Sequence, residues 1–470
     1  MPPPTASSQR PLDPEGVNKR RSTQASNAEE KPAGLSRNKS TRSRRSSTAK
    51  KRPPITAWSQ FKHVVFGSWV NLLLFLVPVG FAVNYAHLNG IVVFVINFIA
   101  IIPLAGMLSY ATEELALHVG ETLGGLLNAS FGNAVELIVG IQALVKGEIT
   151  IVKTSLIGSM LSNLLLVMGM CFFLGGYNRT EQYFNITVAQ TAASLLALAV
   201  ASLIIPSVFR LWVEPQATVP DLVDTDALSR GTAVLLLFVY ACYLLFQLKT
   251  HVAIYNEPSQ KVGKRKTKVE EGETILGIAR IGAGTAASAG GQVNQSNLVH
   301  REDADDDEDE EEIPVLTKIG ALVALAGSTV LVAFCSEFMV DNIQSVAGEG
   351  KGLSTTFLGL ILLPIVGNAA EHATAVTVAI KDKMDLAIGV AVGSSMQIAL
   401  LVLPFVVIVG WGMGTDEMNL SFDGFQIAVL FVSVLLVNYL IGDGKSHWLE
   451  GVLLMTTYII IAVAAFVYPD

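Results

Sequence analysis

Two glutamates in matching short motifs are the residues of this chain best suited to chemistry. Gly-Asn-Ala-Val-Glu ends at Glu136, Gly-Asn-Ala-Ala-Glu ends at Glu371, and both motifs lie inside long apolar stretches. An ionisable side chain inside a membrane segment is costly and is by default a functional-site candidate. Two of them in matching positions predict a cation site between two related halves of the chain. The expected cation ligands are Glu136, Glu371, Gly132, Asn133, Gly367 and Asn368.

The residues around each glutamate favour a hard divalent cation. A glycine destabilises a helix interior by about 0.5–1 kcal/mol relative to alanine and lets the backbone approach a ligand closely. A helix that is locally unwound at this point exposes backbone carbonyls beside the carboxylate. Ca2+ takes about 6–8 oxygen ligands and needs neither sulfur nor imidazole. The alternative is that both glutamates are structural groups that hydrogen-bond to neighbouring helices.

The same two carboxylates suggest how a cation and protons compete. Without a metal, burial and like-charge repulsion both favour the protonated form of a close carboxylate pair. Binding of a divalent cation and binding of protons at Glu136 and Glu371 then exclude each other, as an exchanger requires. His372 adjoins Glu371, whereas Leu137 follows Glu136. This imidazole either relays protons or packs against a carbonyl, and the sequence leaves both roles open.

Hydroxyl and amide side chains follow each motif at the same spacing. A Gly-Ser pair begins at Gly158 after the first motif and at Gly393 after the second, equally far from the motif glycine in each case. Small polar side chains in membrane helices commonly serve helix packing and interhelical hydrogen bonds. One or two of them are expected to complete the oxygen shell of the cation. The candidates for either role are Ser159, Ser162, Asn163, Ser394, Ser395 and Gln397.

Further acidic residues lie outside the two motifs. The second predicted span ends at an acidic pair, Glu337 is a buried acid in the seventh span, and an acidic run covers residues 302–312. A block of like charge is usually a solvated loop. The other interpretations are a funnel that concentrates divalent cations at the cytosolic mouth, or a helix that gates this entrance. The predicted entrance acids are Glu113, Glu114, Glu308, Glu310, Glu311 and Glu312.

The composition is that of a membrane protein. Hydrophobic residues make up 51% of the chain and charged residues 15%, and the mean hydropathy is +0.50. The net charge of −8 is the sum over a basic tail and an acidic loop, so it does not represent the charge of either segment. The three cysteines lie in apolar runs, which argues against a disulfide framework. The string that begins at Glu371 lacks the His-Glu-x-x-His pattern of zinc proteases, so an enzyme is not expected.

Apolar segments long enough to cross a bilayer recur along the chain. They predict an all-α polytopic membrane protein of eleven transmembrane helices, arranged as one plus five plus five. Because five is odd, the second five-helix repeat has inverted topology relative to the first, as in many secondary transporters. The predicted spans are residues 67–85, 91–110, 123–145, 149–174, 186–206, 231–248, 315–340, 355–380, 386–411, 422–440 and 448–466.

This pattern divides the chain into five parts. We expect a disordered basic cytosolic tail at 1–57, the first transmembrane helix at 58–88, the first repeat at 89–249, a cytosolic linker at 250–313, and the second repeat at 314–470. The positive-inside rule puts the N-terminus in the cytosol, and eleven crossings put the C-terminus on the lumenal side. The tail either only fixes this topology or binds anionic lipid or the protein's own cytosolic face.

The two motifs resemble the signature repeats of the CAX-type calcium/proton exchangers, which belong to the calcium/cation antiporter superfamily. The resemblance extends over about residues 58–467 and is close to the fungal vacuolar exchangers, and His372 favours the proton-coupled branch. It implies movement of Ca2+, and often of Mn2+ or other divalent ions, from the cytosol into an acidic vacuole in exchange for protons. It also implies that Glu136 and Glu371 are the cation ligands, and that residues 302–312 form the family's acidic helix near the cytosolic entrance.

The expected partners follow from this interpretation. They are the transported divalent cation and membrane lipid, with no cofactor besides the exchanged Ca2+ and H+ and with no nucleic acid. Self-association into a homo-oligomer and a regulatory contact of the basic tail stay open. A sodium-coupled calcium exchanger and a divalent cation channel are the alternative functions. The matched inverted halves favour alternating access over a pore.

Overall fold

The structure is a computed structural model of the chain. It describes residues 56–119, 121–212, 225–255, 261–263, 314–348 and 352–469. The predicted basic tail up to residue 55, most of the linker and the whole acidic run at 302–312 lie outside the described residues. The predicted entrance acids Glu308, Glu310, Glu311 and Glu312 therefore also lie outside them.

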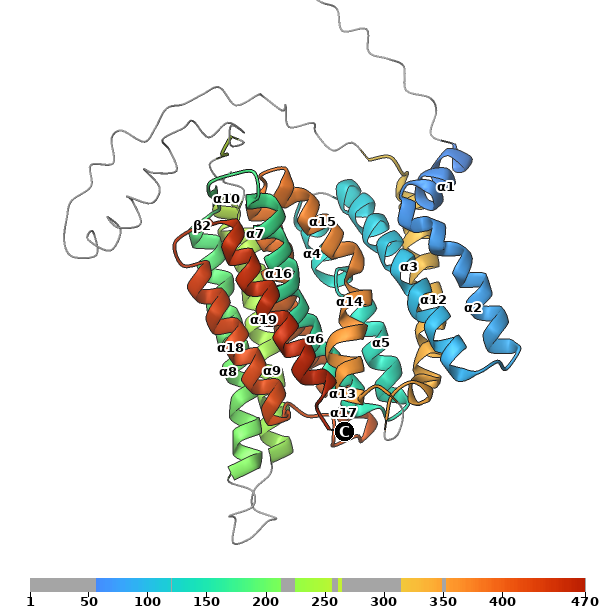
Figure 1. Cartoon of the computed structure of the whole chain (residues 1–470). Helices are drawn as coiled ribbons and strands as arrows, with labels where there is room; N and C mark the ends of the chain where they lie inside the picture. Colours follow the sequence, from blue (N-terminus) through green and yellow to red (C-terminus); the bar gives the residue numbers. More distant parts are fainter. Residues whose placement is uncertain are drawn as a thin grey trace, which may run out of the picture. The chain divides into compact units, whose positions relative to one another are not determined.

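Helices make up most of the described chain, in agreement with the predicted fold class (Figure 1). Within the described residues, seven helical segments are long and apolar enough to cross a membrane. Each coincides with one of the predicted spans. They are α3 (Gly90–Val119), α6 to α7 (Ile149–Gly176), α8 (Ile186–Trp212), α9 with its π-helical end (Thr225–Thr250), α12 (Lys318–Asp341), α16 to α17 (Met384–Met413) and α19 (Trp448–Phe466).

Bent or short helices occupy the positions of the other predicted spans. Two helix pairs are apolar enough to cross when taken together but are bent by 95° and 59°, respectively. Two further apolar helices are shorter than a full crossing. The count of eleven spans therefore stays a prediction. The bent pairs are α1 (Ala57–Phe66) with the run ending in α2 (Trp69–Tyr85), and α13 to α14 (Thr355–Gly367) with α15 (Ala369–Ile380); the shorter helices are α5 (Ala134–Val145) and α18 (Gly424–Leu440).

Several predicted boundaries differ from the structure, among them those of the second and third spans. The apolar pattern predicts that the second span ends at residue 110, but α3 continues to Val119, and Ala111 and Leu115 of this extension belong to the same apolar cluster as Leu325 of α12. It also predicts one helix over 123–145, but this span consists of α4 (Glu121–Phe131) and α5 with a break between them. The break falls on the Gly-Asn pair of the first motif, in agreement with the prediction of a locally unwound helix there.

The connecting segments gather at two opposite ends of the helices. At one end, which we call the ribbon face, β1 (Gln182–Tyr183) pairs antiparallel with β2 (Lys445–Ser446). At the other end, which we call the far face, Lys146 binds Asp341. Figure 1 shows β2 and α10 (Val252–Tyr255) at one end and α13, α17 (Leu403–Met413) and the C-terminus at the other. These two ends are the faces that the predicted topology assigns to opposite sides of the membrane, and this topology stays a prediction.

A buried ion pair fixes the ribbon face. Nε of Arg179 lies 3.5 Å from Oδ1 of Asp382, and both side chains are only 8% exposed. Asp382 also accepts hydrogen bonds from the Gln182 side chain at 2.7 Å and from the backbone N–H of Val262 at 2.6 Å. The carbonyl of Val262 in turn accepts a hydrogen bond from Arg179 at 3.2 Å. The Asp382 carboxylate therefore connects three segments: the loop before α8, the turn between α15 and α16, and a piece of the linker.

The turn that holds Asp382 has a counterpart in the first half of the chain, on the far face. Gly147 adopts φ 78° and Asp382 adopts φ 60°. Glu148 donates its backbone N–H to the carbonyl of Ala143, as Lys383 does to that of Val378. The two turns therefore have the same backbone pattern at opposite ends of the helices.

Loss of the Asp382 charge is expected to destabilise the protein strongly. Asp382→Asn keeps a side chain that tolerates positive φ but leaves Arg179 buried without a counter-charge, which costs about 3 kcal/mol or more. Asp341→Asn is the matched control, because it breaks a pair whose side chains are 39% and 40% exposed, and such pairs contribute at most about 1 kcal/mol. Thermal unfolding of the detergent-solubilised variants measures the difference. Equal shifts in the two unfolding midpoints would contradict the assignment.

Candidate functional site

Each motif lies where one helix ends and another begins. Asn133 precedes α5 with φ −104° and ψ 26°, and Asn368 precedes α15 with φ −97° and ψ 7°. Glu136 and Glu371 consequently occupy the first turn of their helices. The unpaired N–H groups and the dipole of a helix N-terminus favour a negative charge there. The backbone break that the motif glycine permits thus creates a helix N-terminus, and this N-terminus stabilises a carboxylate.

Each glutamate lies against the glycine of the other motif. A Cβ built on Gly367 would be 3.4 Å from Oε1 of Glu136, and a Cβ built on Gly132 would be 3.5 Å from Oε1 of Glu371. The two glutamates are also close enough to interact electrostatically. The structure therefore brings together two motifs that lie in opposite halves of the sequence.

The motif asparagines bind the serines that follow the opposite motif. Asn133 accepts a hydrogen bond from Ser394 Oγ at 2.9 Å, and the Asn368 amide donates to Ser159 Oγ at 3.3 Å. The Asn133 amide also donates to Gln397 Oε1 at 2.8 Å, and the Asn163 amide donates to Ser394 at 3.1 Å. These bonds cross between the halves in both directions. They orient the two helix N-termini on which the glutamates sit.

Two of the predicted polar residues bind only backbone carbonyls. Ser162 donates to the carbonyl of Ser159, and Ser395 donates to the carbonyls of Ala391 and Met160. Both side chains are fully buried. Their contacts are those of helix packing. Of the six candidates, Ser159, Asn163, Ser394 and Gln397 are the ones that join the asparagine network, directly or through Ser394.

Several polar atoms of the site are buried without a hydrogen-bond partner in the described chain. They include Oε1 of Glu136, Oε2 of Glu371 and Oδ1 of Asn368. Buried acceptors of this kind are rare because an unpaired polar group costs about 1–3 kcal/mol. A cation or protons would satisfy them. Nε2 of His372 is also buried without a partner, so this nitrogen does not make the packing bond to a carbonyl that the sequence left open.

A small cavity borders Glu136. It has a volume of about 30 Å3, and its walls include Glu136, Gly367, Ser155, Ser159 and Met339. The cavity has room for a water molecule or a cation of similar size. Ser155 and Met339 are not among the residues that the sequence predicts for the site. The sequence signal for Ser155 is its position one helical turn before Ser159.

The other predicted acids lie away from this cavity. Glu113 is exposed, but Glu114 is only 5% exposed and its Oε2 accepts the backbone N–H groups of Val315 and Leu316 at 2.9 and 2.8 Å. Glu114 therefore holds the segment that leads into α12 and does not face an aqueous entrance. Glu337 is half-buried, not buried as predicted, and its charge acts on Lys146 at the far face. Within the described residues, no group of three or more His, Cys, Asp or Glu is placed to hold a metal.

Comparisons with known proteins agree with this architecture. The family model for the sodium/calcium exchanger protein matches residues 89–249 and 320–467. A vacuolar calcium ion transporter of Cryptococcus neoformans var. grubii is 43% identical over 88% of this chain and 76% of its own. A Ca2+/H+ antiporter of Aphanothece halophytica is 41% identical over 85% of this chain and 96% of its own. The solved structure of native YfkE superposes with a TM-score of 0.63 at 32% identity, over 87% of this chain and 100% of that chain.

A methyl group on Gly367 is expected to weaken divalent-cation binding. In Gly367→Ala the new Cβ would contact Oε1 of Glu136 and no atom of any other residue outside its own helix turn, and it would take up space beside that oxygen that a bound cation and its other oxygen ligands need. We expect the Kd to rise about tenfold, which corresponds to about 1.4 kcal/mol. Calorimetric titration of the purified protein measures it. Gly140→Ala is the control, because a Cβ there meets nothing within 4 Å, and an equal loss in both variants would refute the placement.

Proposed function

Because this chain belongs to the sodium/calcium exchanger protein family, we propose that it is a secondary antiporter that exchanges cytosolic Ca2+ for lumenal protons. The observation that carries the proposal is the reciprocal arrangement of the two motifs. Glu136 lies against Gly367 and Glu371 lies against Gly132. Two carboxylates from different halves, with amide and hydroxyl oxygens around them, form an oxygen-only set suited to Ca2+.

The exchange follows from the charge of the site. One Ca2+ neutralises both carboxylates, and so do two protons. A site in a low-dielectric interior strongly disfavours two bare negative charges, so it holds either the metal or the protons. Ca2+ that enters from the cytosol therefore displaces protons, and protons from an acidic lumen displace Ca2+. His372, one residue beyond Glu371, is a candidate for passing those protons on. The charge balance sets a minimum of about two protons for each Ca2+.

We also propose alternating access between two inverted five-helix repeats. The equal backbone turns at Gly147 and Asp382 support the inversion, because they are separated in sequence by the same interval as the two motifs and lie at opposite ends of the helices. The paired π-helical segments Ser162–Val167 and Ile398–Val402 support it as well. Such segments occur frequently at functional sites. Rocking of one repeat against the other would expose the shared site to one face at a time.

The names of the relatives support the compartment and the coupling ion. The fungal relative is named a vacuolar calcium ion transporter and the cyanobacterial one a Ca2+/H+ antiporter. We therefore propose a vacuolar membrane, with the N-terminus and the ribbon face in the cytosol and the far face in the lumen. Mn2+ is proposed as a second substrate because the same oxygen ligands suit it. Exposed Glu113 and the acidic run at 302–312 are proposed to attract cations on the cytosolic side.

Neutralising either motif glutamate is expected to abolish exchange. Glu136→Gln and Glu371→Gln keep the side-chain shape but remove one of the two charges that bind the metal. In sealed vesicles with an acidic interior, 45Ca2+ uptake should fall to background for both variants, and wild-type uptake should be unaffected by replacing Na+ with an inert cation. Uptake by wild type without the pH gradient would favour a channel, and dependence on Na+ would favour a sodium-coupled exchanger.

Calcium binding is expected to release protons and to weaken as the pH falls. Each carboxylate must lose its proton before it binds the metal, so the apparent Kd should rise by up to about a hundredfold per pH unit where both carboxylates are protonated. Titration calorimetry in buffers of different ionisation enthalpy counts the released protons. We expect about two for wild type and about one for any residual binding by Glu136→Gln. Binding that is independent of pH would contradict the competition.

A further inference from the structure

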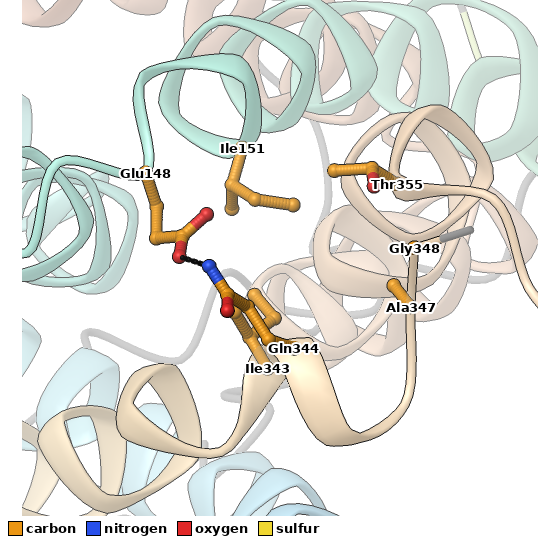
Figure 2. Close-up of a pocket in the computed structure, with 7 residues that line it drawn as sticks. All are labelled: Glu148, Ile151, Ile343, Gln344, Ala347, Gly348 and Thr355. Carbon is orange, nitrogen blue, oxygen red and sulfur yellow. Dashed lines mark hydrogen bonds between the residues drawn. The ribbon is translucent and has the colours of Figure 1, made fainter. Parts of the chain in front are cut away.

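A larger cavity opens at the far face, on the side of α6 (Ile149–Leu161) that also borders the candidate site. Its volume is about 290 Å3, enough for several water molecules. Glu148 and Ile151 line one side, and Ile343 and Gln344 line the other (Figure 2). Neither of the two glutamate motifs falls in this cavity.

Neighbouring parts of the chain line this cavity and the small cavity beside Glu136. Along α6, Ile151 lines the outer cavity, and Ser155 and Ser159 line the small cavity beside Glu136. Opposite them, Ile343 lines the outer cavity and Met339 of α12 lines the inner one. On α6, residues four apart share one face, whereas Ile343 lies in a short 3-10 helix (Ile343–Ser345) that follows the end of α12. We call these two sets of side chains the facing strips; they line both the far-face cavity and the small cavity at Glu136, whose Oε1 is buried without a hydrogen-bond partner.

Glu148 is the carboxylate of the outer cavity. It occupies the residue before α6, but its side chain makes no capping hydrogen bond to that helix. Instead, its Oε1 accepts a hydrogen bond from the Gln344 amide at 2.6 Å. Figure 2 shows the second carboxylate oxygen turned toward Ile151. No capping hydrogen bond therefore engages this side chain, although a helix N-terminus favours its negative charge, and one of its oxygens is directed toward Ile151 in the wall of the cavity.

The residue that matches Glu148 in the ribbon-face turn has the opposite charge. Lys383 occupies the position of the second turn that matches Glu148 in the first, with the same backbone hydrogen bond. The shared turn geometry therefore does not require a carboxylate. At this one position the far-face turn therefore has a negative charge and the ribbon-face turn a positive one, while the position before it holds Gly147 in one turn and Asp382 in the other.

We propose that Glu148 is a transit site for the hydrated divalent cation at the far-face mouth of the exchange pathway. The inference rests on the proposed exchange at Glu136 and Glu371. The cation that leaves Glu136 passes between the two strips and meets Glu148 and the Gln344 side chain before it reaches bulk water. In the reverse direction, Glu148 raises the local cation concentration at this mouth.

A test with defined sidedness follows. In vesicles whose interior is the far-face side, Glu148→Gln should raise the apparent KM for Ca2+ efflux at least about threefold, because the mouth no longer attracts the cation. The KM for uptake from the opposite side should not change. Glu417→Gln is the matched control, because Glu417 is exposed in the far-face segment that contacts Arg230 through Asp416 and does not line the cavity.

The outcomes separate this inference from the proposed function. Wild-type vesicles without any proton-driven Ca2+ exchange would overturn the function itself. Normal wild-type exchange with an unchanged efflux KM in Glu148→Gln would overturn only the transit site. An equal rise in Glu417→Gln would do the same, since it would show a general effect of surface charge.

Cysteine accessibility tests the route without measuring transport. In a variant with Cys171, Cys242 and Cys335 replaced by alanine, Ser155→Cys should react with a membrane-impermeant thiol reagent added at the far face. Val152→Cys should not react, because Val152 is fully buried on another side of α6. Reaction of Ser155→Cys only from the ribbon face, or none at all, would contradict a far-face route.

Discussion

The fold of this protein is governed by the cost of keeping two carboxylates inside a membrane while leaving them available to a ligand. A salt bridge to a basic residue would neutralise the carboxylate but would also prevent it from binding a cation. The structure instead puts Glu136 and Glu371 in the first turns of helices that begin inside the bundle. The helix N-terminus lowers the cost of the charge without contributing a counter-ion. Buried oxygens without partners remain, and a cation or protons would satisfy them.

Because of this arrangement, residues from both halves of the chain are needed to form the site. Asn133 is held by Ser394, Asn368 binds Ser159, and each glutamate lies against the other half's glycine. Neither half alone therefore orients its own carboxylate. A movement between the halves would alter all four contacts together, which provides a physical link between the state of the site and the relative position of the repeats.

The parts that were predictable from the sequence are those set by local patterns. Apolar runs located the helices, and the repeated motif identified the two glutamates before any contact was known. The sequence could not reveal that Glu114 is buried, because its partners are backbone N–H groups of a segment far away along the chain. Glu148 was missed for a related reason. A single acid in a short polar turn resembles any surface charge until the cavity beside it is seen.

The two halves of the chain differ in side chains at matching positions of the two turns. Where the first turn has Gly147, the second has Asp382 in the same left-handed region of φ, which disfavours most side chains. Three groups bind that carboxylate at the ribbon face, including the linker backbone at Val262. The next position holds Glu148 in one turn and Lys383 in the other. Since a common backbone permits either residue, the turn itself does not select the charge at this position: Asp382 fastens the linker backbone at the ribbon face, and Glu148 at the far face is the residue that we propose as a transit site.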